Sequence, residues 1–423
     1  MSPKLAVIGA GSTYTPELID GIIARRTEFP VDRISLMDID PERLAVVGGF
    51  VQRMAVSACS GGLGRQDHLS SLSVELHQDL DAALNGADFV ITQIRVGGQI
   101  WRHLDTVLAV RHGLIGQETT GLAGFAKAMR TIPEMLKICE AIERVAPGAW
   151  LINFTNPSGI VTEAACRYGR AKTIGLCNVP INMKIAVAEQ LGARVDEIDL
   201  DYVGLNHLSW IRKVFWRGRD VTKRVLEGSA APTALRLLSS LRMIPSPYLR
   251  YFYSEREVIT EQRAAEKTRA EAVMEIEAEL LEAYRDPRLA EKPEALGRRG
   301  GAHYSLAAVD VMSSIHSDDA RTQVVDVPQS GAVNGFAASA VMELPCSVDS
   351  EGAHPRPVGE IEPEIRGLMQ QVKAYEELTV RAAVERSRDL ALLALATNPL
   401  VRDVGVAERA LDELITGGRL GLF

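Results

Sequence analysis

The chain lacks the features that mark several large classes of protein. Its 423 residues carry a formal net charge of -8, which argues against a basic, nucleic-acid-binding surface. No stretch reaches the roughly 18 consecutive apolar residues that a membrane-spanning helix needs. A predicted strand begins at Lys4, without the charged and then apolar leader of a signal peptide. We therefore expect a cytoplasmic protein that binds neither nucleic acid nor membranes.

Cysteine is also scarce. The five cysteines are odd in number and widely spaced, and no C-x-x-C pair occurs among them. This pattern suits a reducing compartment rather than a disulfide framework. Cys139, Cys166 and Cys346 are interpreted as small core residues. Cys177 differs from these, because it directly follows a predicted strand.

The first half of the chain alternates short strands with helices. Strands are predicted at residues 5–8, 34–37, 89–91 and 150–152. Helices are predicted at residues 16–26, 41–58 and 132–145, with Pro133 in the first turn of the last. Alternation of this kind indicates an α/β fold, in which residues 1–180 form a Rossmann-like, doubly wound parallel sheet.

The second half has a different pattern and is predicted to be an α+β domain over residues 181–423. Strands are expected within residues 199–221, 322–327 and 341–344, and long helices at 258–285 and 363–395. This domain is expected to carry substrate-binding and metal-binding groups and a subunit interface. Gly61–Gly64 is the most loop-like segment of the chain.

A glycine-rich turn after the first strand predicts dinucleotide binding. Gly9 would allow a tight turn, and Gly11 would let the backbone approach a pyrophosphate at a helix N-terminus. Tyr14 replaces the third glycine of the full fingerprint. Asp38 ends the second strand, where its carboxylate would bind ribose hydroxyls and repel a 2′-phosphate, which favours NAD over NADP. The predicted cofactor-binding residues are Gly9, Gly11, Ser12, Thr13 and Asp38. The alternative is a plain tight turn with a surface aspartate.

Two further strand ends carry candidate metal ligands. Cys177 follows a strand at residues 172–176, and His207 follows one at residues 200–204. Ligands of open α/β sheets bind beyond the carboxyl ends of strands, and a thiolate with an imidazole can hold a divalent transition metal. Two protein ligands would leave coordination positions open for substrate oxygens. Taken alone, their spacing favours the alternative, in which Cys177 is a small buried thiol and His207 a hydrogen-bonded polar group.

In combination these segments resemble glycoside hydrolase family 4, the NAD- and metal-dependent glycosidases. The matching segments are Gly9–Ser12, Arg95–Gly98, Gly116–Gly121, Asn153–Pro157, Cys177–Pro180, Gly204–His207, Pro247–Tyr253 and Thr268–Glu271. Within the family the chain resembles the 6-phospho-β-glucosidase branch, since Asn178 stands where some α-acting relatives carry an aspartate.

The resemblance implies a reaction and a set of residue roles. The reaction is hydrolysis of 6-phospho-β-glucosides, such as cellobiose 6-phosphate, through oxidation at C3 by NAD, removal of the C2 proton, elimination and addition of water. A divalent metal, Mn²⁺, would be held by Cys177 and His207. Tyr248 would be the base, in preference to Tyr251 or Tyr253, and Glu118 would raise its basicity. The implied substrate-binding residues are Arg95, Asn156, Asn178 and Arg269. Dimers or tetramers are expected from the family.

Other functions remain open at this point. A 6-phospho-α-glucosidase or α-galactosidase of the same family would carry the same motifs. A dehydrogenase of the lactate or malate type would share a related fold but would need no metal ligands. A silent NAD-binding sensor of sugar phosphates is a further alternative. The groups that hold the 6-phosphate are not identified; Ser12, Thr13 and the turn at 298–303 are candidates.

Overall fold

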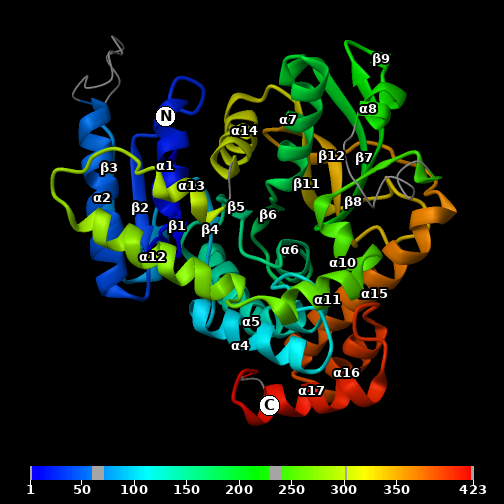
Figure 1. Cartoon of the computed structure of the whole chain (residues 1–423). Coiled ribbons are helices and arrows are strands. Elements are labelled where there is room, and N and C mark those ends of the chain that lie inside the picture. The colour runs from blue at the N-terminus through cyan, green and yellow to red at the C-terminus, as the bar shows by residue number, and fades with distance from the viewer. Residues whose placement is uncertain (1, 60–70, 229–239, 301–302, 421–423) are drawn as a thin grey trace.

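The structure is a computed structural model that describes residues 2–59, 71–228, 240–300 and 303–420. The predicted loop at Gly61–Gly64 lies outside these residues. Figure 1 shows helices on both sides of a long twisted sheet, with the first strands of the chain at one end and strands from residues 198–220 near the other. Among the described residues, no helix is both long and apolar enough to cross a membrane.

The N-terminal half forms the predicted doubly wound sheet. Its strands are β1 (Lys4–Ile8), β2 (Arg33–Met37), β3 (Ser73–His77), β4 (Phe89–Thr92), β5 (Trp150–Asn153) and β6 (Lys172–Gly175). They are all parallel and lie in the order β3-β2-β1-β4-β5-β6, which is the Rossmann order. All five residues of β1 are buried, as expected for a central parallel strand covered on both faces. The predicted fold class is therefore confirmed.

Helices cover both faces of this sheet. They are α1 (Thr15–Ala24), α2 (Pro41–Cys59), α3 (Leu80–Leu84), α4 (Gly98–Arg111), α5 (Gly121–Val145), α6 (Ser158–Tyr168) and α7 (Val179–Leu191). The prediction for α5 was wrong at its start, and Pro133 lies inside the helix rather than in its first turn. Residues 121–132 are buried on every side, so they show no alternation of polar and apolar positions that would reveal a helix.

The second half continues the same sheet. Its strands are β7 (Ile198–Leu205), β8 (Leu208–Trp216), β9 (Arg219–Asp220), β10 (Ile244–Pro245), β11 (Arg321–Pro328), β12 (Val341–Asp349) and β13 (Gly352–Pro355). The antiparallel pair β11–β12 lies between β6 and β7 (Figure 1). Asp326 is paired with Gly175 on one side, and Glu343 is paired with Gly204 on the other. The boundary predicted at residue 180 falls in the first turn of α7, and both the sheet and the main core continue across it.

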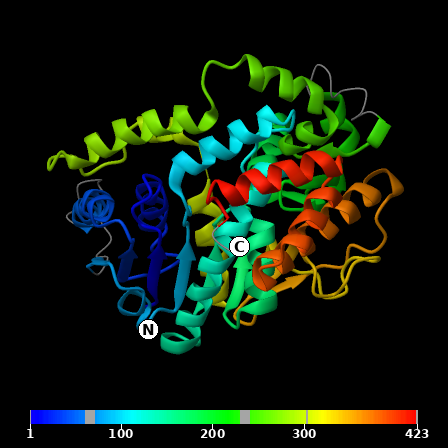
Figure 2. The same cartoon turned by 90° about the horizontal axis from the view of Figure 1, so that it is seen from below.

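The remaining elements include a short helical turn, η2 (Pro247–Leu249), and further helices. These are α8 (Thr222–Gly228), α10 (Arg250–Tyr253), α11 (Glu255–Ala264), α12 (Arg269–Arg285), α13 (Ala295–Arg299), α14 (Tyr304–Ser317), α15 (Pro363–Glu385), α16 (Arg388–Thr397) and α17 (Val404–Thr416). Helix α12 packs against α2 and α4 and so reaches back over the N-terminal half (Figures 1 and 2).

Two predicted long helices are each divided in the structure. The helix predicted at 258–285 is α11 followed by α12, because Thr268 forms a capping box with Glu271 and starts a new helix. The helix predicted at 363–395 is α15 followed by α16. Arg386 ends α15 with a left-handed backbone (φ 52°), and the Ser387 side chain caps α16.

Candidate active site

A cavity of about 1000 Å³ lies beyond the carboxyl ends of the parallel strands. It brings together most of the residues that the sequence singled out. Those in its lining are Gly9, Gly11, Ser12, Asp38, Arg95, Glu118, Asn156, Asn178, Tyr248 and Arg269. Three others are not in the lining and are buried: Thr13 is 0% exposed, Cys177 4% and His207 5%.

The glycine-rich turn is held tightly against neighbouring strands. Gly9 has a left-handed backbone (φ 88°), and a Cβ atom there would come within 3.0 Å of the Gln93 backbone. The Gly11 N–H donates to Oδ2 of Asp38 at 2.7 Å, which ties the turn to the end of β2. The backbone N–H of Asp40 donates to the other oxygen of Asp38 at 2.9 Å. The turn and the Asp38 carboxylate are therefore fixed before any ligand arrives.

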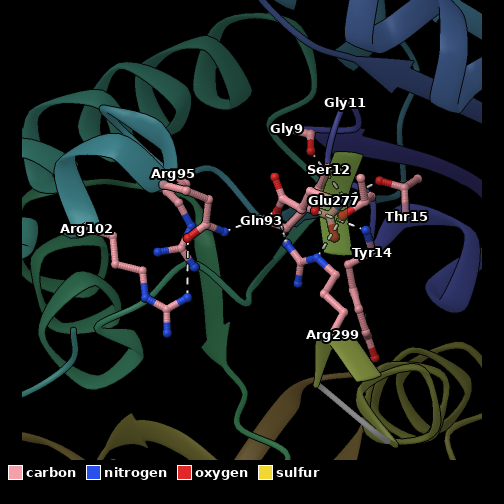
Figure 3. A network of polar contacts seen from close by, with 12 residues as sticks. Gly9, Gly11, Ser12, Tyr14, Thr15, Gln93, Arg95, Arg102, Glu277 and Arg299 are labelled. Atoms are coloured by element: carbon pink, nitrogen blue, oxygen red, sulfur yellow. Dashed lines mark hydrogen bonds and ion pairs between the residues drawn. The ribbon is translucent and has the colours of Figure 1, made fainter. Parts of the chain in front are cut away.

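Thr13, a predicted cofactor-binding residue, makes its hydrogen bonds with other residues of the protein. Its hydroxyl oxygen accepts a hydrogen bond from Nε of Arg299 at 2.7 Å, and its carbonyl accepts one from the Tyr284 hydroxyl at 2.9 Å. Arg299 also pairs with Glu277 at 3.0 Å. Figure 3 shows Arg299 and Glu277 reaching the glycine-rich turn from the second half of the chain. Thr13 thus links the turn to α12 and α13.

Glu118 lies on one wall of the cavity among three cations. Its carboxylate pairs with Arg95, with Nη2 of Arg102 at 2.9 Å and with Nζ of Lys127 at 2.7 Å. Burial disfavours the charge of Glu118, but the three cations, Arg95 foremost, hold its pKa well below the ordinary value. Burial and the neighbouring Arg95 lower the pKa of Lys127 to about 7.

Sequence reasoning did not find Arg102, Lys127 or Glu277 as part of this wall. Arg102 and Glu277 lie in charged helical segments that resemble solvated faces. Lys127 did carry a signal, because it is a single charged residue within the apolar run from Leu122 to Met129. A buried lysine is rare without a partner, so such a residue predicts a carboxylate or a ligand beside it.

Cys177 lies between β6 and α7. The N–H of Val179, in the first turn of α7, donates to its sulfur at 3.4 Å. Burial is the main cause that raises the pKa of the thiol well above its ordinary range, so the group is neutral in the protein alone. Loss of the thiol proton would need a cation beside the sulfur.

His207 lies in the tight turn that joins β7 to β8. Its backbone is left-handed (φ 64°), an uncommon conformation for a residue with a side chain. Nδ1 lies 2.7 Å from Oγ1 of Thr119. Burial lowers the pKa of the imidazole to about 3, so the ring is neutral, which is the form that binds metals.

Tyr248, in η2, lies beside both candidate ligands. Its ring stacks on the imidazole of His207, with centroids 3.7 Å apart and planes 7° apart. It also packs against the small apolar cluster that contains Cys177. Among the described residues, no group of three or more His, Cys, Asp or Glu side chains is arranged to hold a metal. A soft sulfur and a neutral imidazole beside a cavity nevertheless fit a divalent transition metal with open coordination positions.

Glu118 affects Tyr248 through its negative charge. Both oxygens of Glu118 are bound by the cations described above. Burial raises the pKa of the Tyr248 phenol, and Cys177 and Glu118 act in the same direction. The phenol is therefore protonated in the protein alone, and it needs nearby positive charge to act as a base near neutral pH.

The candidate substrate-binding residues differ in their surroundings. Asn156, in the segment between β5 and α6, has a buried Oδ1 atom without a hydrogen-bond partner among the residues that the structure describes. Asn178 begins α7 beside Cys177. Arg269 begins α12 and donates to the carbonyls of Arg298 and Arg299 at 3.3 and 3.2 Å, so it also braces the turn after α13.

Comparison with known proteins identifies the family. The family model described as "Family 4 glycosyl hydrolase" matches residues 4–193, and the one described as "Family 4 glycosyl hydrolase C-terminal domain" matches residues 202–401. The chain is 40% identical to a probable 6-phospho-beta-glucosidase of Bacillus subtilis, with 97% of this chain and 95% of the relative covered. It is 37% identical to a 6-phospho-beta-glucosidase of Thermotoga maritima, with 98% of each covered.

A solved structure supports the same assignment. The Thermotoga maritima 6-phospho-beta-glucosidase with manganese, NAD+ and glucose-6-phosphate matches with a TM-score of 0.90, at 35% identity and with 98% of each chain covered. The resemblance predicted from the motifs is confirmed, and this chain belongs to glycoside hydrolase family 4.

Proposed function

We propose that this protein hydrolyses 6-phospho-β-glucosides with NAD and a divalent metal, Mn²⁺, as cofactors. One observation carries the proposal: a single cavity joins the glycine-rich turn and Asp38 to Tyr248, the residue beside Cys177 and His207. Relatives that are 40%, 37% and 35% identical are named as a probable 6-phospho-beta-glucosidase and two 6-phospho-beta-glucosidases, whereas five relatives named for 6-phospho-α-glucosides or maltose-6'-phosphate are 27–29% identical.

The residues at the two ends of the cavity would hold the cofactors. The turn at Gly9 and Gly11 would accept the pyrophosphate, and Asp38 would accept ribose hydroxyls. Cys177 and His207 would hold the metal. When bound, NAD supplies a reversible hydride acceptor, and the metal supplies Lewis-acid stabilisation of negative charge on sugar oxygens.

Tyr248 is the proposed base for the proton on C2 of the sugar. Its ring stacks on the imidazole of His207, so the phenol lies beside one of the proposed metal ligands. Burial keeps it protonated in the empty protein, so its basicity would appear only in the assembled site, where positive charge stands beside it. Asn156 and Asn178 would accept or donate hydrogen bonds to sugar hydroxyls.

The charge of the cavity wall favours a phosphorylated substrate. The cavity lining carries seven cationic side chains and five carboxylates. Four of the cations, Arg95, Arg102, Lys127 and Arg299, gather around Glu118 and Glu277. Arginine side chains bind phosphate oxygens with a fixed fork of donors. A wall of this kind would favour a sugar phosphate over a neutral disaccharide.

Turnover of paired chromogenic substrates tests the proposal. The purified protein with NAD and Mn²⁺ is expected to cleave 4-nitrophenyl 6-phospho-β-glucoside, to lose activity in a chelator and to regain it with Mn²⁺. Preference for the 6-phospho-α-glucoside would favour the main alternative within the family. Net accumulation of NADH would favour a dehydrogenase, because the glycosidase reaction regenerates NAD.

We also propose that the protein is a cytoplasmic homodimer or homotetramer. Helix α4 exposes an apolar stripe of Ile100, Leu104 and Val107, with exposed fractions of 64%, 38% and 43%. An apolar stripe of this kind is typical of a surface that another chain covers. Light scattering coupled to size-exclusion chromatography would measure the mass, and a monomer at micromolar concentration would contradict the proposal.

A further inference from the structure

A chain of hydrogen bonds leads from the loop before α5 to His207. Oγ1 of Thr119 lies 2.7 Å from Nδ1 of His207 and 2.6 Å from Oε1 of Gln117. The backbone N–H of Thr119 donates to the same Gln117 oxygen at 2.5 Å. The Thr119 hydroxyl therefore meets the imidazole of a candidate metal ligand, and the Gln117 oxygen holds that hydroxyl in place.

The direction of each bond in this chain follows from the chemistry of the groups. A backbone N–H can only donate, so the Gln117 atom that it meets is the carbonyl oxygen, which can only accept. The Thr119 hydroxyl must then donate its proton to Gln117. Its oxygen is left to accept, so the proton of the neutral imidazole lies on Nδ1 and the lone pair lies on Nε2.

The imidazole has little freedom to turn away from this arrangement. The left-handed turn fixes its backbone, and the Tyr248 ring covers one of its faces at 3.7 Å. His207 is 5% exposed, so the residue is largely shielded from water. A histidine that ligates a metal through one nitrogen usually donates its other N–H to a fixed acceptor, which sets the tautomer.

We propose that Thr119, held by Gln117, is a positioning residue that fixes the tautomer of His207 and so presents Nε2 to the metal. This inference rests on the proposed function, since it requires His207 to be a ligand. Thr119 makes no contact with the metal or the sugar in this role; it acts through the imidazole alone.

Two variants of Thr119 separate this role from packing. Thr119→Val keeps the shape but removes the hydroxyl, and Thr119→Ser keeps the hydroxyl but removes a methyl group. In the presence of NAD, calorimetry is expected to show Mn²⁺ affinity about 10- to 100-fold weaker for Thr119→Val. Affinity should be within about twofold of the wild type for Thr119→Ser, as expected if the hydroxyl is the functional group.

A second readout reports the tautomer directly in the full-length, metal-free protein. Nitrogen-15 spectra that correlate ring protons with both imidazole nitrogens are expected to show the proton on Nδ1 in the wild type and on Nε2 in Thr119→Val. His207→Ala identifies the signal. An unchanged tautomer or unchanged Mn²⁺ affinity in Thr119→Val would overturn the role of Thr119. If His207→Ala binds Mn²⁺ as tightly as the wild type, the proposed metal site itself is wrong.

Discussion

Glu118 is a carboxylate that three cations share, the buried Lys127 and the half-buried Arg95 and Arg102, and its removal should be costly. Glu118→Gln keeps the shape of the side chain but leaves Arg95, Arg102 and Lys127 without a counter-ion in a wall where Glu118 is 15% exposed. Breaking a buried ion pair by removing one partner typically costs about 3–5 kcal/mol. Unfolding entropy of about 2.1 cal/mol/K per residue over 423 residues gives about 0.9 kcal/mol/K. We therefore expect a fall in Tm of about 3–6 °C.

The fall in Tm caused by Glu118→Gln should depend on pH, because Lys127 titrates near neutral pH. Its pKa is about 7 in the folded protein against 10.5 for a free lysine side chain, so the unfolded chain binds more protons between these pH values and stability rises with pH across that window. Glu118 raises the Lys127 pKa, so Glu118→Gln moves the lower limit of the window below pH 7. The deficit in Tm should therefore be larger at pH 6 than at pH 8.5.

Differential scanning calorimetry at these two pH values measures both effects. Glu134→Gln is a matched control, because Glu134 makes a solvent-exposed pair with Lys137 at 2.8 Å. Exposed pairs contribute about 0–1 kcal/mol, which corresponds to a change in Tm of about 1 °C or less. A Glu118→Gln protein as stable as this control would refute the idea that the carboxylate neutralises the wall.

Three other changes give distinct expected results. Tyr248→Phe should fold normally but lose about 10²–10⁴-fold in kcat together with exchange of the substrate C2 proton in D₂O, and retained exchange would show that another group is the base. Asp38→Asn keeps an acceptor for the Gly11 N–H but removes the charge, so fluorescence titration should show weaker NAD binding and stronger NADP binding; unchanged preference would contradict its role. Burial, reinforced by the nearby Asp326, raises the pKa of Glu343, so the folded protein binds this proton more tightly than the unfolded chain and the stability that it contributes at low pH is lost as the pH rises through the raised pKa; Glu343→Gln should therefore raise Tm relative to wild type more at pH 8.5 than at pH 5.5, and an equal shift at both would contradict a raised pKa.

Features that depend on neighbours in the sequence were predictable. The strand before Gly9, the turn and the strand that ends at Asp38 are all local patterns, and the parallel sheet follows from their alternation. The strand ends before Cys177 and His207 were recognised in the same way. Their residue types indicated the chemistry, and the family resemblance supplied the roles.

Features that depend on distant pairing were not predictable from the same patterns. Nothing local shows that β11 and β12 lie between β6 and β7, because that placement is decided by pairing of Asp326 and Glu343 with two glycines far away in the chain. Arg102 and Glu277 look like solvated charges until the fold brings Glu118 and Arg299 beside them. The contact between Thr119 and His207 spans 88 residues and has no periodic signal.

The insertion of β11 and β12 has a consequence for biosynthesis. The strand that leads to Cys177 and the strand that leads to His207 are not neighbours in the sheet; residues 321–349 occupy the space between them. A nascent chain that ends at residue 300 already contains Cys177 and His207. It lacks β11 and β12, the two strands that set the distance between them in the finished sheet. On the proposed function, manganese would therefore be loaded only after residues 321–349 have been synthesised and have joined the sheet.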